Sequence, residues 1–394
     1  MIERVTLKEV YNVYKKWLNV SDTRRIDIGL AVALTREVIG TKLWLIFIGN
    51  SGDWKSEQLN ALDDSEEING KIRYNNIRKI EKLTSKTLIN GSPNVPDLAP
   101  ELKDKIVLIP EMAQLLKLHP NEKGEVWAQL RNLYDGTAQG DSGMGARKRY
   151  SNLNVTLMAG STPAIDSQIL IHQDLGSREL IWRTSIKDVY EDNKSMDDAW
   201  SNEEKEENMR EELKEITIKF LNTNKYDLRV KIDDEIKEKL KIYCHYLSFM
   251  RSPAEIDSYT GELLNDAHPE KPTRLIKQIK RLFIALKSLD SGYSDEKALS
   301  VISYVIQSSS FQNRVKVLNF LFHQDNEIGS NKVSKDLKIG NKTIQRELNI
   351  LWNLNIVNRR EEEYENFGKL MERHYWSINK EHSILKMVYP SSTN

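Results

Sequence analysis

Short apolar runs separated by helical or loop patterns organise the first half of the chain. The runs lie at residues 44–48, 86–89, 106–109 and 153–159. Buried strands of a parallel sheet appear in the sequence as such short apolar runs, because helices cover both faces of the sheet. Upstream, residues 5–39 carry apolar positions at helical spacing, which predicts two helices. The pattern therefore predicts an α/β core preceded by helices.

Strand patterns disappear after about residue 185 and return only near the end of the chain. Charged helices are predicted at 197–220 and 233–250, and a further helix at 272–289. Between Glu191 and Glu215 eleven acidic residues stand against four basic ones. This region is predicted to be an all-helical lid with an acidic insertion.

The last part of the chain has the spacing of a helix-turn-helix followed by a wing. Helices are predicted at 312–323, 332–339 and 342–353, and two strands at 355–360 and 374–378. This order predicts a C-terminal winged helix-turn-helix domain.

Polar side chains of the third predicted helix and of the wing are the candidates for DNA contact. Lys342, Gln345 and Arg346 would enter a major groove, while Arg359 and Arg360 would contact the backbone. Winged helices also serve as protein-binding or purely structural modules, and an acidic run adjoins this wing. Both alternatives stay open at the sequence level.

Length, charge and cysteine content limit the remaining possibilities. A chain of 394 residues is longer than the length at which a single hydrophobic core stops growing, so we expect several domains. The expected domains are 1–184, 185–308 and 309–394. The 58 basic and 58 acidic residues cancel, so an anionic partner would be met by local patches. Cys244, the single cysteine, excludes disulfides within the chain and fits a cytoplasmic location, although such a residue is commonly just a small buried hydrophobe. No apolar run approaches the ~20 residues of a membrane span.

The segment after the first apolar run resembles a phosphate-binding loop. Against the pattern G-x-x-x-x-G-K-[ST], Gly49, Lys55 and Ser56 match, and Trp54 replaces the second glycine. The alternative is an ordinary turn between strand and helix with a solvated lysine. The candidate nucleotide-binding residues are Gly49, Asn50, Ser51, Gly52, Asp53, Trp54, Lys55 and Ser56.

Two later strand ends carry polar groups that an ATPase needs. Glu111 follows the run 106–109 and is placed to orient water or to hold Mg²⁺ with Ser56, although Pro110 replaces one of the two usual acids. Its alternative role is to cap a following helix. Ser161 or Thr162 is placed to contact the γ-phosphate or the water.

A glycine-rich loop ahead of the last of these strands ends in consecutive cations. Arg147, Lys148 and Arg149 stand beside Tyr150, a combination that suits contact with a nucleic-acid strand. A solvated basic loop without a partner is the alternative.

Taken in order, these features resemble the AAA+ ATPases of mobile elements and plasmids, which are distant relatives of the minichromosome maintenance helicases. The phosphate loop, the acidic strand tip, segment 127–136, the basic insertion, Leu-Met-Ala-Gly-Ser-Thr-Pro and Leu-Gly-Ser-Arg-Glu carry this resemblance over residues 25–290. It implies a P-loop AAA+ core, a parallel sheet flanked by helices, with a helical lid.

The resemblance also implies roles for single residues. Lys55 and Ser56 would contact phosphate and Mg²⁺, Glu111 would be the Walker B acid, and Ser161 or Thr162 would be the first sensor. Arg178 would be the arginine finger, Arg274 the second sensor, and residues Arg147 to Arg149 would belong to a pore hairpin. Without the family order, an ion pair within the subunit is the alternative for Arg178.

The resulting hypothesis is an ATP- and Mg²⁺-dependent DNA translocase or helicase that acts in replication of a plasmid, virus or integrated element. It would work as a homo-oligomeric ring, with a hexamer favoured, and without a membrane partner. Two other classes stay open: a nucleotide-switched DNA-binding protein with little or no hydrolysis, and a regulatory or structural module in which only the winged domain acts.

Overall fold

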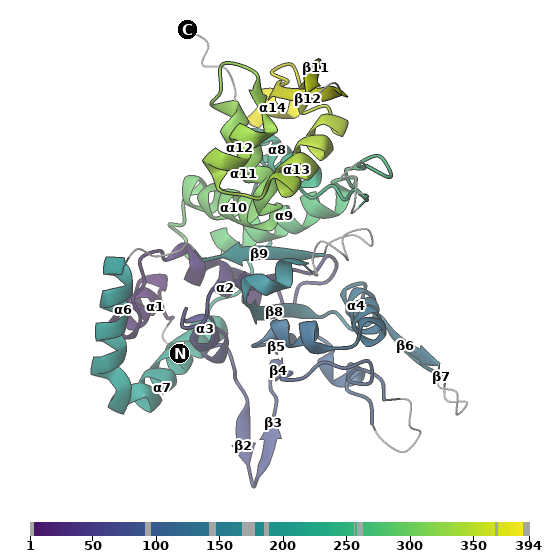
Figure 1. Cartoon of the computed structure of the whole chain (residues 1–394). Helices are drawn as coiled ribbons and strands as arrows, with labels where there is room; N and C mark the ends of the chain where they lie inside the picture. The colour runs from purple at the N-terminus through teal and green to yellow at the C-terminus, as the bar shows by residue number, and fades with distance from the viewer. Residues whose placement is uncertain are drawn as a thin grey trace. The chain divides into compact units, whose positions relative to one another are not determined.

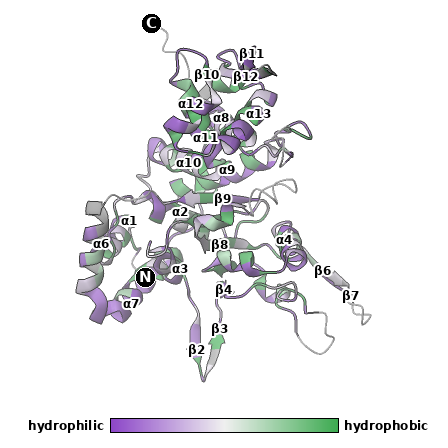
Figure 2. Cartoon of the chain, viewed as in Figure 1, coloured by the Kyte–Doolittle hydropathy of each residue, from purple (hydrophilic) through white to green (hydrophobic). Residues whose placement is uncertain are grey.

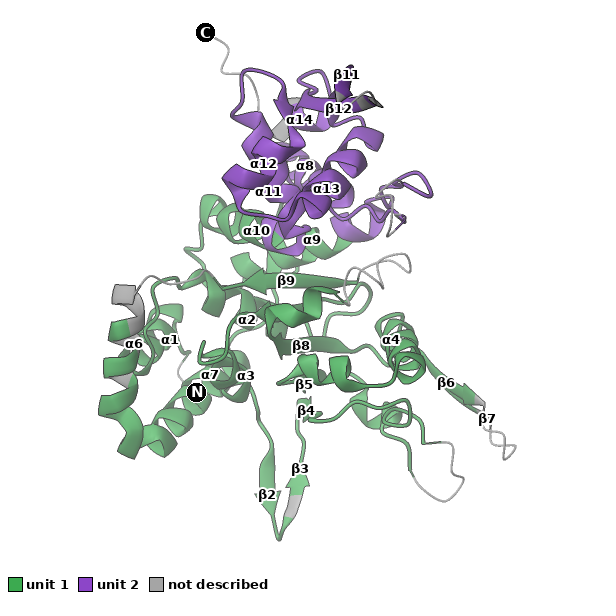
Figure 3. Ribbon diagram, viewed as in Figure 1, with its two compact units in different colours: residues 1–172, 177–232, 277–305 green, residues 173–176, 233–276, 306–394 purple. Residues whose placement is uncertain are grey.

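The computed structural model describes residues 4–90, 96–141, 147–167, 178–184, 189–255, 257, 263–366 and 369–388. Its chain forms two compact units (Figure 3). Unit 1 comprises residues 1–172, 177–232 and 277–305, and unit 2 comprises residues 173–176, 233–276 and 306–394. These divisions differ from the predicted boundaries at residues 184 and 308, and the three-domain division stays a prediction. Within the described ranges, no helix is both long enough and apolar enough to cross a bilayer.

A five-stranded parallel sheet forms the centre of unit 1 (Figure 1). The strand order is β4-β5-β8-β1-β9. The strands are β1 (Trp44–Ile48), β4 (Ile77–Lys79), β5 (Ile106–Ile109), β8 (Thr156–Ser161) and β9 (Glu179–Arg183). All five residues of β1 are buried between β8 and β9, as expected for a central strand. The predicted α/β core with a parallel sheet is therefore confirmed.

The sheet differs from the sequence prediction at its edges. Residues 86–89 do not form a strand, and β4 occupies the edge position beside β5 instead. Leu88 is buried all the same, and its carbonyl accepts from the N–H of Ala99 in a turn-rich segment. The predicted strand 153–159 begins later, at Thr156, because Asn154 has a φ of 53° that breaks an extended backbone. An apolar run can therefore be buried without forming a strand.

Helices cover both faces of this sheet. One face packs with α4 (Pro120–Tyr134) in a core that includes Ile46, Val107 and Leu157. On the other face, a Cβ at Gly29 of α2 (Arg24–Leu34) would lie 3.7 Å from the Phe47 ring, which shows how closely α2 approaches β1. The remaining short helices near the sheet are α3 (Lys55–Asn60), η1 (Ala99–Leu102), η2 (Met112–Lys117) and η3 (Pro163–Ile165).

Two hairpins are inserted between sheet strands. The first pairs β2 (Glu66–Ile68) with β3 (Lys71–Arg73), and the second pairs β6 (Ala138–Asp141) with β7 (Arg147–Tyr150). Both project from the sheet in unit 1 (Figure 1). The second hairpin confirms that the predicted basic loop has a hairpin at its base.

Further helices of unit 1 precede and follow the sheet. The two helices predicted within residues 5–39 are α1 (Leu7–Trp17) and α2. The acidic region forms α6 (Val189–Asn202), η5 (Glu203–Lys205) and α7 (Glu206–Thr223), so the single helix predicted at 197–220 is interrupted. Figure 2 colours most of α7 as hydrophilic. Its buried side packs on α1, where the hydroxyls of Tyr14 and Thr217 lie 3.1 Å apart.

Unit 2 contains helices and a small antiparallel sheet of order β10-β12-β11. Its elements are α8 (Asp234–Met250), α11 (Gln312–Phe322), β10 (Ile328–Gly329), α12 (Ser330–Leu337), α13 (Asn341–Asn353), β11 (Val357–Asn366), β12 (Lys369–Ile378) and α14 (Ser383–Val388). Helices α9 (Thr273–Lys287) and α10 (Asp295–Ser309) each run from one unit into the other. The predicted helices of this region are present, and both long strands exceed their predicted lengths because they form a 10-residue ladder.

Candidate nucleotide-binding site

The candidate phosphate loop lies at the carboxyl end of the central strand β1. It begins at Gly49, after Ile48, and α3 begins at Lys55. The Gly49 N–H donates to the carbonyl of Ser161 at the end of β8 (3.1 Å), and the Thr184 N–H donates to the carbonyl of Ile48 (2.9 Å). The carboxyl edge of a parallel sheet, where connections leave in opposite directions, is the usual ligand position of such folds.

Two glycines around this loop have close neighbours. A Cβ on Gly49 would lie 2.1 Å from Thr184 Oγ1 and 2.3 Å from Asp53 Oδ2. A Cβ on Gly160 would lie 2.5 Å from the carbonyl oxygen of Pro110. These glycines allow the ends of β1, β5, β8 and β9 to meet. The sequence pattern does not point to Thr184, because it does not predict the strand β9 that precedes this residue.

Lys55 is buried in the loop, with 6% of the residue exposed. Its Nζ donates to the carbonyl oxygens of Gly49 (2.9 Å) and Asn50 (2.6 Å). Burial lowers the pKa of Lys55, and the Arg25 charge adds to this, whereas the Asp53 and Glu111 carboxylates act in the opposite direction. The loop's own carbonyls thus hold a buried cation, and the alternative of a solvated lysine is wrong.

Trp54, at the position of the missing glycine, packs toward the N-terminal helices. Its ring meets Tyr14 of α1 edge-on at 6.3 Å, and the Arg25 guanidinium of α2 lies 3.7 Å from its centroid. The neighbouring loop residues Ser51 and Gly52 are exposed, and so is Ser56. The contacts of the Trp54 indole with α1 and α2 therefore explain its position.

The other predicted groups of the site lie on adjacent strand ends. Glu111 follows β5, but its carboxylate accepts from the Ala113 N–H (2.9 Å) and so caps η2, which was the alternative interpretation. Ser161, at the end of β8, has a buried Oγ with no hydrogen-bond partner in the described part of the chain. Thr162 follows it and is half-buried. A buried hydroxyl without a partner suits contact with a ligand oxygen.

The two arginines with predicted family roles pair with acids of their own units. Arg178 Nη2 lies 2.9 Å from Asp135 Oδ2, the ion pair within the subunit that the sequence left open. Arg274 belongs to unit 2, where its Nη2 lies 3.2 Å from Glu270 Oε2. Their assignments as arginine finger and second sensor stay predictions.

Arg25 is a residue of the site that sequence reasoning missed. Its Nη1 lies 2.6 Å from Asp53 Oδ1, and its Nε donates to Gln58 Oε1 (2.9 Å). Burial lowers the pKa of this guanidinium, and the Asp53 charge opposes the shift. No local motif marks Arg25, because it reaches the loop from 28 residues upstream.

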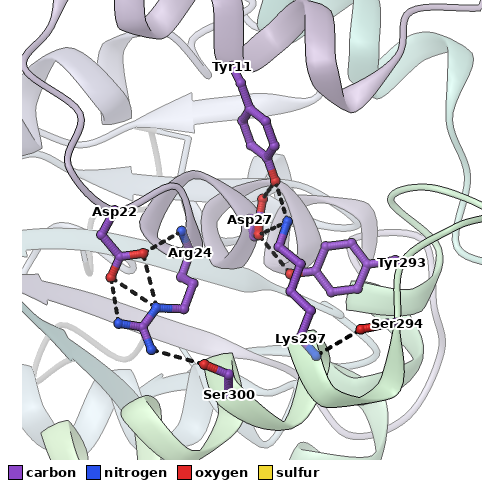
Figure 4. Close-up of polar contacts among 8 residues, drawn as sticks. All are labelled: Tyr11, Asp22, Arg24, Asp27, Tyr293, Ser294, Lys297 and Ser300. Atoms are coloured by element: carbon purple, nitrogen blue, oxygen red, sulfur yellow. Dashed lines mark hydrogen bonds and ion pairs between the residues drawn. The ribbon is translucent and has the colours of Figure 1, made fainter.

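A network around Asp27 fixes the helix that carries Arg25 (Figure 4). The fully buried Asp27 carboxylate accepts from the hydroxyls of Tyr11 and Tyr293, and Lys297 Nζ lies 3.0 Å from its Oδ2. Burial and the Asp27 charge raise the pKa of both tyrosines, which keeps them as donors. Arg24 adds a hydrogen bond to Ser300 (3.0 Å). These contacts hold α2 between α1 and the segment of α10 in unit 1.

In the β6–β7 hairpin, one predicted DNA-binding cation has an internal role. Lys148 Nζ lies 3.1 Å from Asp97 Oδ2, and the Tyr150 hydroxyl donates to the same oxygen (2.8 Å). The Asp97 side chain is fully buried. Arg149 is exposed, whereas the side chain of Arg147 lies outside the described residues. Lys148 therefore secures the root of the hairpin, which its sequence position did not reveal.

The candidate DNA residues of unit 2 divide into two groups. On α13, Lys342 and Gln345 are exposed, as expected of groove-reading residues. In contrast, three arginines pair with glutamates: Arg346 with Glu347 (2.8 Å), Arg359 with Glu361 (2.6 Å) and Arg360 with Glu327 (2.5 Å). Local carboxylates thus compete with any phosphate for these three cations.

Comparisons with known proteins give no family for this chain. No family model and no curated protein matches it. Among solved structures, one described as SCCmec type IV Cch, an active helicase, is similar at 9% identity with a TM-score of 0.39, covering 97% of this chain and 72% of that one. The apo C-terminal region of NrS-1 is similar at 13% identity with a TM-score of 0.31, covering 95% and 77%. TM-scores below 0.5 do not establish a shared fold.

Proposed function

We propose that this protein is an AAA+ ATPase that moves along or unwinds DNA in the replication of a plasmid, virus or integrated element. The observation that carries the proposal is the place of Lys55, on a glycine-bearing loop at the carboxyl end of β1, between the ends of β8 and β9. Among the residues that the structure describes, Lys55 Nζ donates to two backbone carbonyls and forms no ion pair, so an entering polyphosphate would break no salt bridge of this lysine.

In this proposal the loop residues and the adjacent strand ends bind the nucleotide. Lys55 would bind phosphate oxygens, and the free hydroxyl of Ser161 would bind the γ-phosphate or the attacking water. Ser56 would hold Mg²⁺, which would neutralise the charge that develops on the phosphates. Glu111 would orient water after releasing its cap on η2. Within the described ranges no group of three or more His, Cys, Asp or Glu is placed to hold a metal.

DNA contact would come from two places. The β6–β7 hairpin would present Arg149 to a strand in the channel of a homo-oligomeric ring. In unit 2, α11, α12, α13 and the β11–β12 ladder would act as a winged helix-turn-helix, with Lys342 and Gln345 facing DNA. In the ring, Arg178 would exchange Asp135 for the γ-phosphate bound by a neighbouring subunit.

Specific contacts favour a second candidate, a nucleotide-switched DNA-binding protein with little hydrolysis. Glu111 is engaged as a cap, Pro110 takes the place of an acid, and Arg178 is paired with Asp135. The two contacts and the Pro110 substitution each withdraw a group that hydrolysis needs, and they leave nucleotide binding intact.

Phosphate release separates the two candidates. A motor hydrolyses ATP in a Mg²⁺-dependent way and faster with single-stranded DNA, and Lys55→Ala abolishes this turnover. A switch binds ATP without measurable turnover. Turnover that Lys55→Ala leaves unchanged contradicts the proposal, because the activity would then arise elsewhere or from a contaminant.

A further inference from the structure

An internal carboxylate lies inside the candidate phosphate loop. A Cβ on Gly49 would lie only 2.3 Å from Asp53 Oδ2, so the Asp53 carboxylate lies close to Gly49 at the start of the loop. Lys55 Nζ meanwhile bonds to the carbonyls of Gly49 and Asn50. A negative group of the protein therefore occupies space beside the loop residues that would receive a phosphate.

The cation that holds this carboxylate comes from outside the motif. Arg25 Nη1 lies 2.6 Å from Asp53 Oδ1, with 5% and 15% of the two side chains exposed. Arg25 also stacks on Trp54, the residue that departs from the phosphate-loop pattern. Because the Asp27 network fixes α2, Arg25 approaches the loop from a helix held on both sides.

Neither member of this pair is fully satisfied. Arg25 Nη2 and Asp53 Oδ2 are buried, and neither has a hydrogen-bond partner among the residues that the structure describes. Unmade hydrogen bonds of buried charged groups are costly. A polyphosphate offers several acceptor oxygens in one group, so it can satisfy Arg25 Nη2 and also replace Asp53 Oδ1 as the partner of Nη1.

From these contacts we infer that Arg25 is a second phosphate-binding cation of the loop, and that Asp53 is a tethered competitor which a polyphosphate displaces. The inference rests on the proposed function, since it concerns the same loop. It adds that the affinity for nucleotide is limited by the protein's own carboxylate and that α2 supplies a ligand-binding side chain.

The test measures equilibrium binding of a fluorescent ATP analogue with Mg²⁺, and its displacement by inorganic tripolyphosphate. Asp53→Asn keeps the size of the side chain and removes its charge. Glu57→Gln is the matched control, because Glu57 is a nearby carboxylate in the first turn of α3 that pairs with Arg210 instead of Arg25. Lys55→Ala reports whether binding uses the loop at all.

Asp53→Asn is expected to bind both probes about tenfold more tightly than wild type, as loss of a charge-assisted contact to the competitor requires, while Glu57→Gln changes affinity less than about twofold. Arg25→Gln is expected to weaken binding of both probes about tenfold. Because tripolyphosphate has no base or sugar, a weaker affinity of Arg25→Gln for this probe shows that Arg25 contacts the phosphates.

The outcomes distinguish this inference from the proposed function. Lys55-dependent binding that Asp53→Asn leaves unchanged or weakens overturns the inference alone. No binding by wild type, with binding restored in Asp53→Asn, supports it. No binding by either protein removes the inference and the proposed function together. If Arg25→Gln unfolds, the doubly neutral Arg25→Gln/Asp53→Asn protein replaces it and must bind tripolyphosphate more weakly than Asp53→Asn.

Discussion

Arg314 of α11 and Glu347 of α13 form an ion pair at 3.0 Å in which 2% and 3% of their side chains are exposed. Arg314 Nη1 also donates to the Ser252 carbonyl (2.8 Å), beyond the end of α8. One buried guanidinium thus joins α11, α13 and the end of α8, three segments of unit 2 that lie far apart in the sequence.

Removing one member of this pair leaves the other buried and uncompensated. We expect Arg314→Ala to lower the free energy of unfolding of unit 2 by about 3–5 kcal/mol. Arg346→Ala is the control, because Arg346 contacts the same Glu347 from a more exposed position and is expected to cost at most about 1 kcal/mol. Urea titration of both variants measures the difference, and equal losses would show that the buried pair is not the joint between these helices.

A second buried carboxylate, Asp27, depends on Lys297 in unit 1. Lys297→Met is expected to destabilise the protein by about 2–3 kcal/mol, at or below the range for buried pairs because part of Lys297 is exposed. Asp27→Asn in the same chain is expected to recover part of the loss, because the amide needs no counter-ion. Thermal unfolding of the single and double variants provides the measurement. A double variant no more stable than Lys297→Met would contradict the assignment of Lys297 as the counter-ion.

Cys244 gives a probe of opening in unit 2. It is buried, and burial raises the pKa of its thiol to about 12, so roughly one molecule in ten thousand carries a thiolate at pH 8. We expect no reaction with an aromatic disulfide reagent in the native protein within minutes and reaction of one thiol per chain in denaturant. Rapid labelling of the native protein would show that α8 is not packed as described.

The two described cations of the β6–β7 hairpin are expected to differ in their effect on DNA binding. Arg149→Ala should weaken binding to single-stranded DNA and reduce the slope of log affinity against log salt by about 1. Lys148→Ala should change the slope less, because Lys148 is paired with Asp97. Fluorescence anisotropy at several salt concentrations tests this order, and a larger change in slope for Lys148→Ala would reverse the assignment.

The sequence predicts those features that depend on local patterns. The loop from Gly49 follows an apolar strand and leads into a helix, and the helices within residues 312–353 have clear apolar spacing, so all of these could be located. The strand predicted at 86–89 was wrong because an apolar run can be buried from a turn, as Leu88 is. The short strand β4 offers only one buried residue, Ile77, to any such pattern.

Long-range pairing accounts for most of what the sequence could not predict. Arg25 reaches Asp53, and Asp97 captures Lys148, over separations at which no periodicity or motif relates the partners. A run of basic residues such as 147–149 does not reveal which of its side chains will form an ion pair with a buried acid. Arg178 illustrates the same point, since its pairing with Asp135 depends on where α4 ends relative to β9.

Binding of nucleotide at Lys55 is the claim on which the account depends, and equilibrium titration with a fluorescent ATP analogue tests it most directly. Wild type and Lys82→Ala, a control at an exposed lysine outside the loop, are predicted to give the same saturable, Mg²⁺-dependent signal, and Lys55→Ala to weaken it about 10- to 100-fold. Equal affinity in all three proteins, or no saturable signal in wild type and in Asp53→Asn, would contradict the claim.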